Sequence, residues 1–220
     1  MNFSPPQILF EDNHLLALNK PAGQLTMGDD TGDVTMVDVA RDYLRVKYNK
    51  PGNVFVGVVH RLDRPVSGVL LFARTSKAAA RLSDQFRRGT VRKIYRAVVE
   101  GRSAADRKEL TDWLLKDRTT NVVGVVSPST PGAQKCVLQY QVAERHGDLL
   151  HLDVEPLTGR SHQIRVQLSH AGMPICGDGK YGSRQRLGAR IRLHAHTLEL
   201  QHPTRQETLR ILAPIPSDFD

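Results

Sequence analysis

Short apolar runs alternate with polar residues along the chain and predict strands. Within residues 149–156, Leu150, Leu152 and Val154 alternate with polar side chains, as one half-buried face of a strand requires. Similar runs bounded by turn residues predict seven more strands. The eight predicted strands cover residues 7–12, 15–20, 68–74, 93–101, 136–145, 149–156, 195–203 and 207–214.

Three other segments repeat apolar residues at helical spacing. The middle one has Leu82 and Phe86 on one face, a Thr or Ser in position to cap its start, and Gly89 as a stop. Many strands and few helices predict the α+β class, with a mixed, mainly antiparallel sheet flanked by helices and loops. We find no domain linker, so one domain over residues 1–220 is expected. The predicted helices cover residues 35–48, 75–89 and 161–172.

The net charge of the chain indicates which class of molecule it binds. The 220 residues include 31 Lys and Arg against 23 Asp and Glu, for a net charge of +8. An excess of cations favours a polyanion, because each phosphate that is neutralised releases counterions. A basic enzyme with small-molecule substrates is the alternative that charge alone leaves open.

The two cysteines, Cys136 and Cys176, are far apart, so neither a disulfide framework nor a thiolate metal site is expected. The longest apolar run is far shorter than the roughly 20 residues that span a bilayer. We therefore expect a soluble, cytoplasmic protein with no membrane contact.

Several cofactor and metal motifs are absent from the sequence. It has no GxxxxGK[ST] phosphate loop, no GxGxxG turn after a strand and no GxSxG elbow. His194 and His196 share one face of a predicted strand without an obvious third metal ligand. Neither a metal nor a nucleotide cofactor is predicted, which leaves acid and arginine chemistry.

Charged residues and glycines concentrate in "NKPAG" (19–23), "HRLDRPVSG" (60–68) and the segment 158–182. In the second motif Asp63 stands between Arg61 and Arg64. Such an acid forms either an ordinary surface ion pair or a carboxylate that is kept ionised for chemistry. The residues taken alone leave both readings open.

Taken together and in order, these motifs resemble the RluA-type family of RNA pseudouridine synthases. "KIYRAVVEG", "TGRSHQIR" and the "LHA" and "HP" near the C-terminus also fit, so the likeness runs from about residue 8 to residue 217. The resemblance implies a mainly antiparallel sheet with an active cleft across it. It also implies cofactor-free isomerisation of uridine in RNA, in which the base leaves the ribose at N1 and rejoins through C5.

The resemblance also assigns site residues. The catalytic aspartate falls on Asp63, the active-site tyrosine on Tyr95, the arginine that pairs with the aspartate on Arg165, and the arginine that displaces the target base on Arg61. An ionised carboxylate beside the ribose suits a reaction that builds positive charge there. Whether Asp63 attacks C1′ or removes a proton from C2′ stays open.

Further contacts with RNA are expected around these residues. The expected contacts are His60, Arg64, Ile164, Arg87, Arg88, Arg92 and Lys93. Two positions depart from the family pattern: Val66 stands where Thr is common, and Met27 stands where His is frequent. Because the first predicted strand begins at residue 7, we expect no small S4-like RNA-binding domain of the kind that some members carry.

Three functions remain in competition. The first is an RNA pseudouridine synthase, expected to be a monomer, with large-subunit rRNA favoured over tRNA as substrate. The second is a non-catalytic RNA-binding or ribosome-assembly protein of the same fold. The third is a nucleoside glycosidase, which needs a second acid near Asp63; Asp178 is the candidate.

Overall fold

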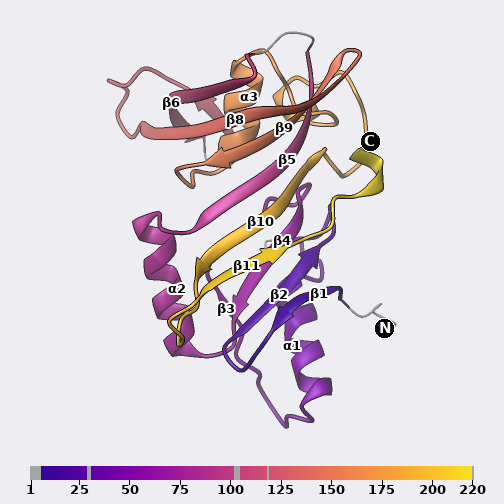
Figure 1. Cartoon of the computed structure of the whole chain (residues 1–220), viewed down its shortest axis with the longest axis vertical. Helices are drawn as coiled ribbons and strands as arrows, with labels where there is room; N and C mark the ends of the chain where they lie inside the picture. Colours follow the sequence, from indigo (N-terminus) through magenta and orange to yellow (C-terminus); the bar gives the residue numbers. More distant parts are fainter. Residues whose placement is uncertain (1–5, 29–30, 102–104, 118, 220) are drawn as a thin grey trace. The chain divides into compact units, whose positions relative to one another are not determined.

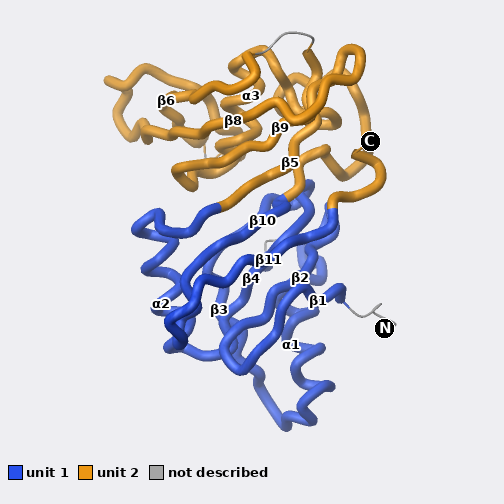
Figure 2. Tube along the Cα trace, viewed as in Figure 1, with its two compact units in different colours: residues 1–92, 195–214 blue, residues 93–194, 215–220 orange. Residues whose placement is uncertain are grey.

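The computed structural model describes residues 6–28, 31–101, 105–117 and 119–219. They divide into two compact units, coloured separately in Figure 2. Unit 1 comprises residues 1–92 and 195–214, and unit 2 comprises residues 93–194 and 215–220. Because the chain passes from one unit to the other more than once, each unit is built from segments that are distant in sequence. The prediction of one domain over residues 1–220 stays a prediction.

Unit 1 is a sheet with mainly antiparallel pairs and two helices (Figure 1). Its strands follow the order β1–β2–β4–β10, with β11 paired to β10 and β3 paired to β4. The elements are β1 (Ile8–Glu11), β2 (Leu15–Lys20), α1 (Met36–Lys47), β3 (Gly57–Val58), β4 (Ser67–Ala73), α2 (Ser76–Arg88), β10 (Leu193–Gln201) and β11 (Thr208–Leu212).

Unit 2 holds a second run of antiparallel strands, in the order β5–β9–β8–β6–β7, with one α-helix among its described residues. The elements are β5 (Arg92–Glu100), β6 (Arg107–Asp117), β7 (Val122–Val125), β8 (Gln134–His146), β9 (Leu149–Pro156), α3 (Gln163–His170), and the short 3-10 turns η1 (Gly179–Tyr181) and η2 (Ser217–Phe219).

Local sequence signals explain where the helices of unit 1 begin and end. Thr35 caps α1 in a capping box with Asp38, whose side chain returns to the Thr35 backbone. Thr75 accepts a hydrogen bond from the Ala78 amide at the start of α2. Gly89 ends α2 in the left-handed conformation, at φ 70°. These signals are readable in the sequence, and the predicted bounds of both helices agree with the structure within one residue.

The core of unit 1 lies on β2 and β4. The side chains of residues 15–18 are fully buried, so β2 is covered on both faces, as its continuous apolar run requires. All seven residues of β4 are buried as well. On one face Leu15 and Leu71 pack with Leu82 of α2. A rigid pair of strands therefore supports the segments that precede and follow it.

Gly68, the glycine of the "SG" that follows Asp63, permits a close approach of two strands. Its φ is 113°, and a Cβ atom at this position would lie 2.3 Å from the carbonyl oxygen of Ala195 on β10. Any side chain would therefore strain the backbone and push the strands apart. The glycine fixes the start of β4 directly against β10.

The α+β class, with a mainly antiparallel sheet flanked by helices, is confirmed. All eight predicted strands and all three predicted helices are present. In the described part of the chain, no helix is long and apolar enough to cross a bilayer. The active cleft across the sheet stays a prediction.

Candidate active site

Asp63 lies on the loop formed by residues 59–66, between β3 and β4, which we name the Asp63 loop. The side chain of Asp63 is half-buried, whereas Leu62 beside it is buried. The Val66 amide donates to the Asp63 carbonyl at 3.0 Å, which closes a turn directly after the aspartate. The loop therefore leads straight from Asp63 into the buried strand β4.

A buried lysine anchors this loop. Lys20, at the end of β2, is 0% exposed. Its ammonium donates to the carbonyls of Pro21 at 2.9 Å, Gln24 at 2.6 Å and Arg64 at 3.1 Å. In its protonated form the side chain thus has three N–H donors for three backbone acceptors, one of which belongs to the residue after Asp63. The "NKPAG" motif serves here to hold the Asp63 loop.

The charge of this lysine is coupled to Asp63. Burial lowers the pKa of Lys20 to about 7, while the nearby carboxylate of Asp63 opposes the shift and Arg64 adds to it. A lysine would not be buried without such partners, because an unpaired ammonium in the core is costly. The carboxylate of Asp63 therefore favours the charged form of the lysine.

Two further contacts fasten the loop to residues 23–26. The hydroxyl of Thr26 donates to the Leu62 carbonyl at 2.9 Å, and the Leu62 amide donates back at 3.2 Å. The Gly23 amide donates to the Arg64 carbonyl at 2.8 Å, and Arg64 Nε donates to the Gly23 carbonyl at 3.0 Å. The residues on both sides of Asp63 are thus fixed by reciprocal hydrogen bonds.

His60 fixes the other end of the loop. Its Nε2 accepts the Leu71 amide of β4 at 2.9 Å, so this nitrogen carries no proton in that contact. The ring stacks on Phe86 of α2 with centroids 4.9 Å apart and 15° between the planes. These contacts place one face and one nitrogen of the imidazole against the protein. The role of His60 in contacting RNA stays a prediction.

We expect His60→Ala to lower the free energy of unfolding by about 1–3 kcal/mol, because it removes an acceptor for a backbone amide and a stacked ring. His60→Gln keeps a side-chain acceptor and should lose less. Urea unfolding of the wild type and both variants measures the difference. Equal losses for Gln and Ala would show that the acceptor contributes nothing.

The arginines predicted to contact RNA in unit 1 differ in how they are held. Arg61 is exposed, and within the described residues no ion pair fixes its guanidinium. Arg64 is exposed but donates to Asp33 at 2.7 Å, besides its contact with Gly23. Arg87 and Arg88 are exposed at the end of α2, and both pair with Asp84. Arg92 is exposed on β5. The sequence did not indicate that three of these arginines have carboxylate partners.

In unit 2, Tyr95 and Lys93 lie two residues apart on β5, so they share a face of the strand. Tyr95 is half-buried and stands opposite Val154 of β9. Burial lowers the pKa of Lys93, and the nearby carboxylate of Glu155 opposes that shift. Tyr95 therefore has the partial exposure that contact with a substrate requires.

Arg165 on α3 is held by an acid that sequence reasoning placed in another role. Its Nε donates to Asp178 Oδ2 at 2.7 Å and its Nη2 donates to Oδ1 at 2.9 Å, with both side chains buried. The guanidinium carbon lies 4.9 Å from the ring centroid of Tyr181. A forked contact and a stacked ring define the orientation of the guanidinium.

The start of α3 is shaped by neighbours of Arg165. His162 caps the helix in the left-handed conformation at φ 53°, with no side-chain capping bond. Its Nδ1 lies 2.6 Å from the Tyr181 hydroxyl, which also accepts the Val123 amide at 3.1 Å. Ile164, a predicted RNA contact, is buried at 7% exposure. The "GRSHQIR" and "GDGKYG" motifs therefore meet through Tyr181 and Asp178.

The predicted catalytic residues fall in both units: Asp63 lies in unit 1, and Tyr95 and Arg165 lie in unit 2. Their meeting stays a prediction. Sequence reasoning missed the supporting residues Lys20, Thr26, Asp178 and Tyr181. The first two lie in or next to "NKPAG" and the others lie in "GDGKYG", so the motifs themselves carried the signal.

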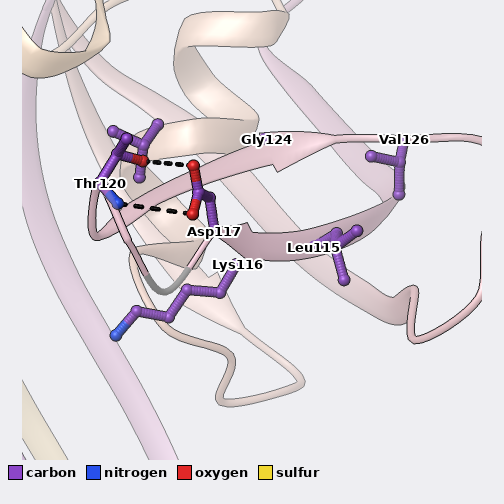
Figure 3. A pocket seen from close by; sticks show the side chains of 7 residues that line it. Leu115, Lys116, Asp117, Thr120, Gly124 and Val126 are labelled. Atoms are coloured by element: carbon purple, nitrogen blue, oxygen red, sulfur yellow. Dashed lines mark hydrogen bonds between the residues drawn. The ribbon is translucent and has the colours of Figure 1, made fainter.

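An open pocket of about 460 Å³ lies elsewhere, on the β6–β7 hairpin (Figure 3). Asp117 accepts from the hydroxyl of Thr120 at 2.8 Å and orders the turn. None of the predicted site residues lines this pocket, so we do not assign it as the active site. The other lining residues are Leu115, Lys116, Val122, Gly124 and Val126. Among the described residues no cluster of three or more His, Cys, Asp or Glu is placed to hold a metal ion.

Comparison with protein families gives one match that covers most of the chain. A family model described as RNA pseudouridylate synthase matches residues 14–170. This interval contains Lys20, the Asp63 loop, Tyr95 and Arg165, so the match covers every element of the candidate site described above except Asp178 and Tyr181.

Curated relatives resemble the chain over nearly its whole length. The ribosomal large subunit pseudouridine synthase C of Vibrio parahaemolyticus is 34% identical over 220 residues, which covers 97% of this chain and 67% of that protein. The protein of the same name in Escherichia coli (strain K12) is 35% identical, with 94% and 66% covered. The chain thus spans about two thirds of the length of these relatives.

Solved structures agree with the assignment of the fold. The structure of human RNA pseudouridylate synthase domain containing 4 superposes with a TM-score of 0.80 at 25% identity, covering 97% of this chain and 90% of that one. The structure of human RNA pseudouridylate synthase domain containing 1 gives a TM-score of 0.79 at 24% identity, which concerns the fold alone.

Proposed function

Because the chain belongs to the RNA pseudouridylate synthase family, we propose that it isomerises uridines in RNA to pseudouridine without a cofactor. The observation that carries the proposal is the anchoring of the Asp63 loop, in which a fully buried lysine holds the backbone beside a half-buried aspartate. An ordinary surface ion pair needs no such support, whereas a catalytic carboxylate must be held in place.

The reaction sets the requirements for the site. The N1–C1′ bond breaks, the base turns, a C5–C1′ bond forms, the proton on C5 is lost and N1 gains one. Positive character develops on the ribose as the first bond breaks, so an ionised carboxylate beside C1′ or C2′ stabilises that state. Asp63 is the acid that we assign to this position, as nucleophile at C1′ or as base at C2′.

The other catalytic roles follow from residue chemistry. Arg165 supplies a positive charge that stays protonated, and we propose it as the partner of the Asp63 carboxylate. Its forked contact with Asp178 fixes the guanidinium. Tyr95 has an aromatic face for stacking on the base and a hydroxyl that can hold the C5 proton. The exposed Arg61 takes the place of the target base in its stack.

The rest of the RNA is held by contacts that position the backbone. We assign this role to His60, Arg64, Arg87, Arg88, Arg92 and Lys93, and we propose Ile164, which is 7% exposed, as an apolar contact with the substrate. The target uridine must leave its stack, which costs a few kcal/mol unless the RNA loop is already open. We propose that one catalytic domain, working as a monomer in the cytoplasm, performs these steps.

We propose large-subunit rRNA as the substrate, in preference to tRNA. The names of the curated relatives from Vibrio parahaemolyticus and Escherichia coli support this class of RNA. Pseudouridine mapping in rRNA and tRNA from cells with and without the gene tests it. The expected result is the loss of one or more pseudouridines from large-subunit rRNA alone. Loss confined to tRNA would assign the other substrate.

A non-catalytic RNA-binding or ribosome-assembly role is the second candidate, because the basic charge of the chain would serve it equally. The two are separated in cells by Asp63→Asn. A catalytic role predicts that this variant leaves the mapped uridines unmodified. An assembly role predicts that it behaves as wild type, while charge-removing variants do not.

A further inference from the structure

We propose that the end of α1 carries a second RNA-binding surface, which holds a stretch of RNA away from the modified uridine. It is built around the ring of Tyr48 and the cations Lys47, Lys50 and Arg74, and we name it the Tyr48 surface. The proposal rests on the proposed function in one respect, that the substrate is RNA. Every residue of this surface lies in unit 1.

The ring of Tyr48 is both ordered and accessible. Tyr48 caps the C-terminus of α1. Its hydroxyl donates to Glu11 Oε1 at 2.6 Å and accepts from Arg74 Nη1 at 3.2 Å. The residue is nevertheless 42% exposed. An aromatic ring that is fixed through its hydroxyl and belongs to a partly exposed residue loses little entropy when a base stacks on it.

Three cations surround this single ring. The Lys47 ammonium lies 5.6 Å from the ring centroid, the Lys50 ammonium lies 5.7 Å from it, and the Arg74 guanidinium carbon lies 4.6 Å from it. Glu11 is the carboxylate that pairs with Lys47 and Arg74. Three positive charges against one negative charge leave an excess of two at the Tyr48 surface.

Some of these side chains are explained by contacts that attach α1 to the sheet of unit 1. Glu11 accepts from Tyr43, Lys47, Tyr48 and Arg74, so it joins the end of α1 to β1 and to the residue after β4. Lys50 takes no part in that attachment. It is exposed, its backbone amide donates to the Arg45 carbonyl at 3.1 Å, and within the described residues its ammonium has neither an ion pair nor a hydrogen bond. The packing of α1 therefore does not account for Lys50.

The chemistry favours RNA over an acidic protein as the occupant. Lysines beside an accessible aromatic ring offer both contacts that a single-stranded RNA needs, a counter-charge for phosphate and a platform for a base. Carboxylates of an acidic protein would use the lysines but not the ring. Lys50 is available for a phosphate, because no carboxylate among the described residues pairs with it, whereas Arg45 of α1 pairs with Asp42.

The salt dependence of RNA binding tests the proposal. The probe is a fluorescein-labelled single-stranded oligoribonucleotide of mixed sequence, and its anisotropy gives the affinity across about 50–200 mM salt. Lys50→Ala should make the slope of log K against log salt less steep by about 0.7, which is the contribution of one phosphate contact with a single strand. Tyr48→Phe keeps the ring but loses the hydrogen bonds that fix it, so it should weaken binding less than Tyr48→Leu, which removes the ring and should weaken binding at every salt concentration.

Lys77→Ala is the matched control, since Lys77 is an exposed lysine on α2 of the same unit. Its salt slope should equal that of wild type. The proposal is overturned if Lys50→Ala leaves the slope unchanged, or if Lys77→Ala lowers it equally. It is also overturned if polyglutamate binds wild type more tightly than RNA does and Lys50→Ala affects only polyglutamate. Thermal unfolding of each variant excludes misfolding as the cause.

Tritium release by wild type from RNA labelled at C5 of uridine separates this proposal from the proposed function. If wild type releases tritium and Lys50→Ala has the salt slope of wild type, the Tyr48 surface is rejected and the proposed isomerase activity stands. If Lys50→Ala has a less steep slope but wild type releases no tritium, the Tyr48 surface stands and the isomerase activity is rejected.

Discussion

Replacing Asp63 by Asn is expected to reduce tritium release from C5-labelled RNA by on the order of 10⁴-fold, the scale of losing one essential catalytic group. An amide of the same shape cannot attack C1′, cannot remove a C2′ proton, and does not balance positive charge on the ribose. The loop should keep its fold, because the hydrogen bonds that hold it do not use the Asp63 carboxylate. They join the Val66 amide to the Asp63 carbonyl, and Leu62 to Thr26. Single-turnover tritium release measures the loss.

The control for this variant is Asp42→Asn, which removes an exposed carboxylate that pairs with Arg45 on α1. It should release tritium at the wild-type rate. The RNA affinity of Asp63→Asn should stay within a few-fold of wild type, because positioning contacts carry most of the affinity. A rate for Asp63→Asn within tenfold of wild type would remove Asp63 from the chemistry.

Lys20→Met is expected to lower the free energy of unfolding by about 2–4 kcal/mol. The substitution keeps the length of the side chain but leaves the carbonyls of Pro21 and Gln24 without their donor, at about 1–3 kcal/mol for each buried group. The Arg64 carbonyl keeps its bond from the Gly23 amide. Urea unfolding measures the change as a lower midpoint at constant slope. Lys77→Met, an exposed control, should change stability by less than about 0.5 kcal/mol.

Wild type and Lys20→Met should also differ in how their stability depends on pH. Burial lowers the pKa of Lys20 from 10.5 to about 7 in the folded protein. Between these values the unfolded chain binds the proton and the folded chain does not, so stability rises with pH and is lost as pH falls toward 7. The advantage of wild type over Lys20→Met should therefore grow between pH 7 and 9, by up to about 1.4 kcal/mol per pH unit. A constant difference over that range would show that Lys20 keeps its proton.

Period-two patterns predicted most of the sheet, and the misses have physical reasons. β6 was not predicted because its inward-facing position 112 is an aspartate, which interrupts the apolar alternation between Leu110 and Leu114. Asp112 accepts from Gln167 of α3 at 2.8 Å, so the polar residue is satisfied inside the fold. β7 is four residues long and contains Gly124, and β3 has only two residues. Strands this short carry no period.

The family resemblance drawn from the motifs is confirmed by the match over residues 14–170, and with it the class of enzyme, an isomerase of RNA. The motifs marked the segments that hold the supporting residues, but the contacts these residues make could not be predicted from the sequence. A lysine at the end of a strand ordinarily faces solvent, whereas Lys20 is buried because three carbonyls of two separate loops converge on it. Asp178 was considered as a second acid of a glycosidase, and the structure instead pairs it with Arg165.

The most direct test of the central claim is tritium release by purified wild-type protein from total rRNA and tRNA labelled at C5 of uridine. Pseudouridine is counted in the same samples. We expect release from large-subunit rRNA in amounts equal to the pseudouridine formed, since each isomerisation removes the hydrogen on C5. A folded protein that releases no tritium from any of these RNAs would contradict the assignment of Asp63 as the catalytic residue of a uridine isomerase.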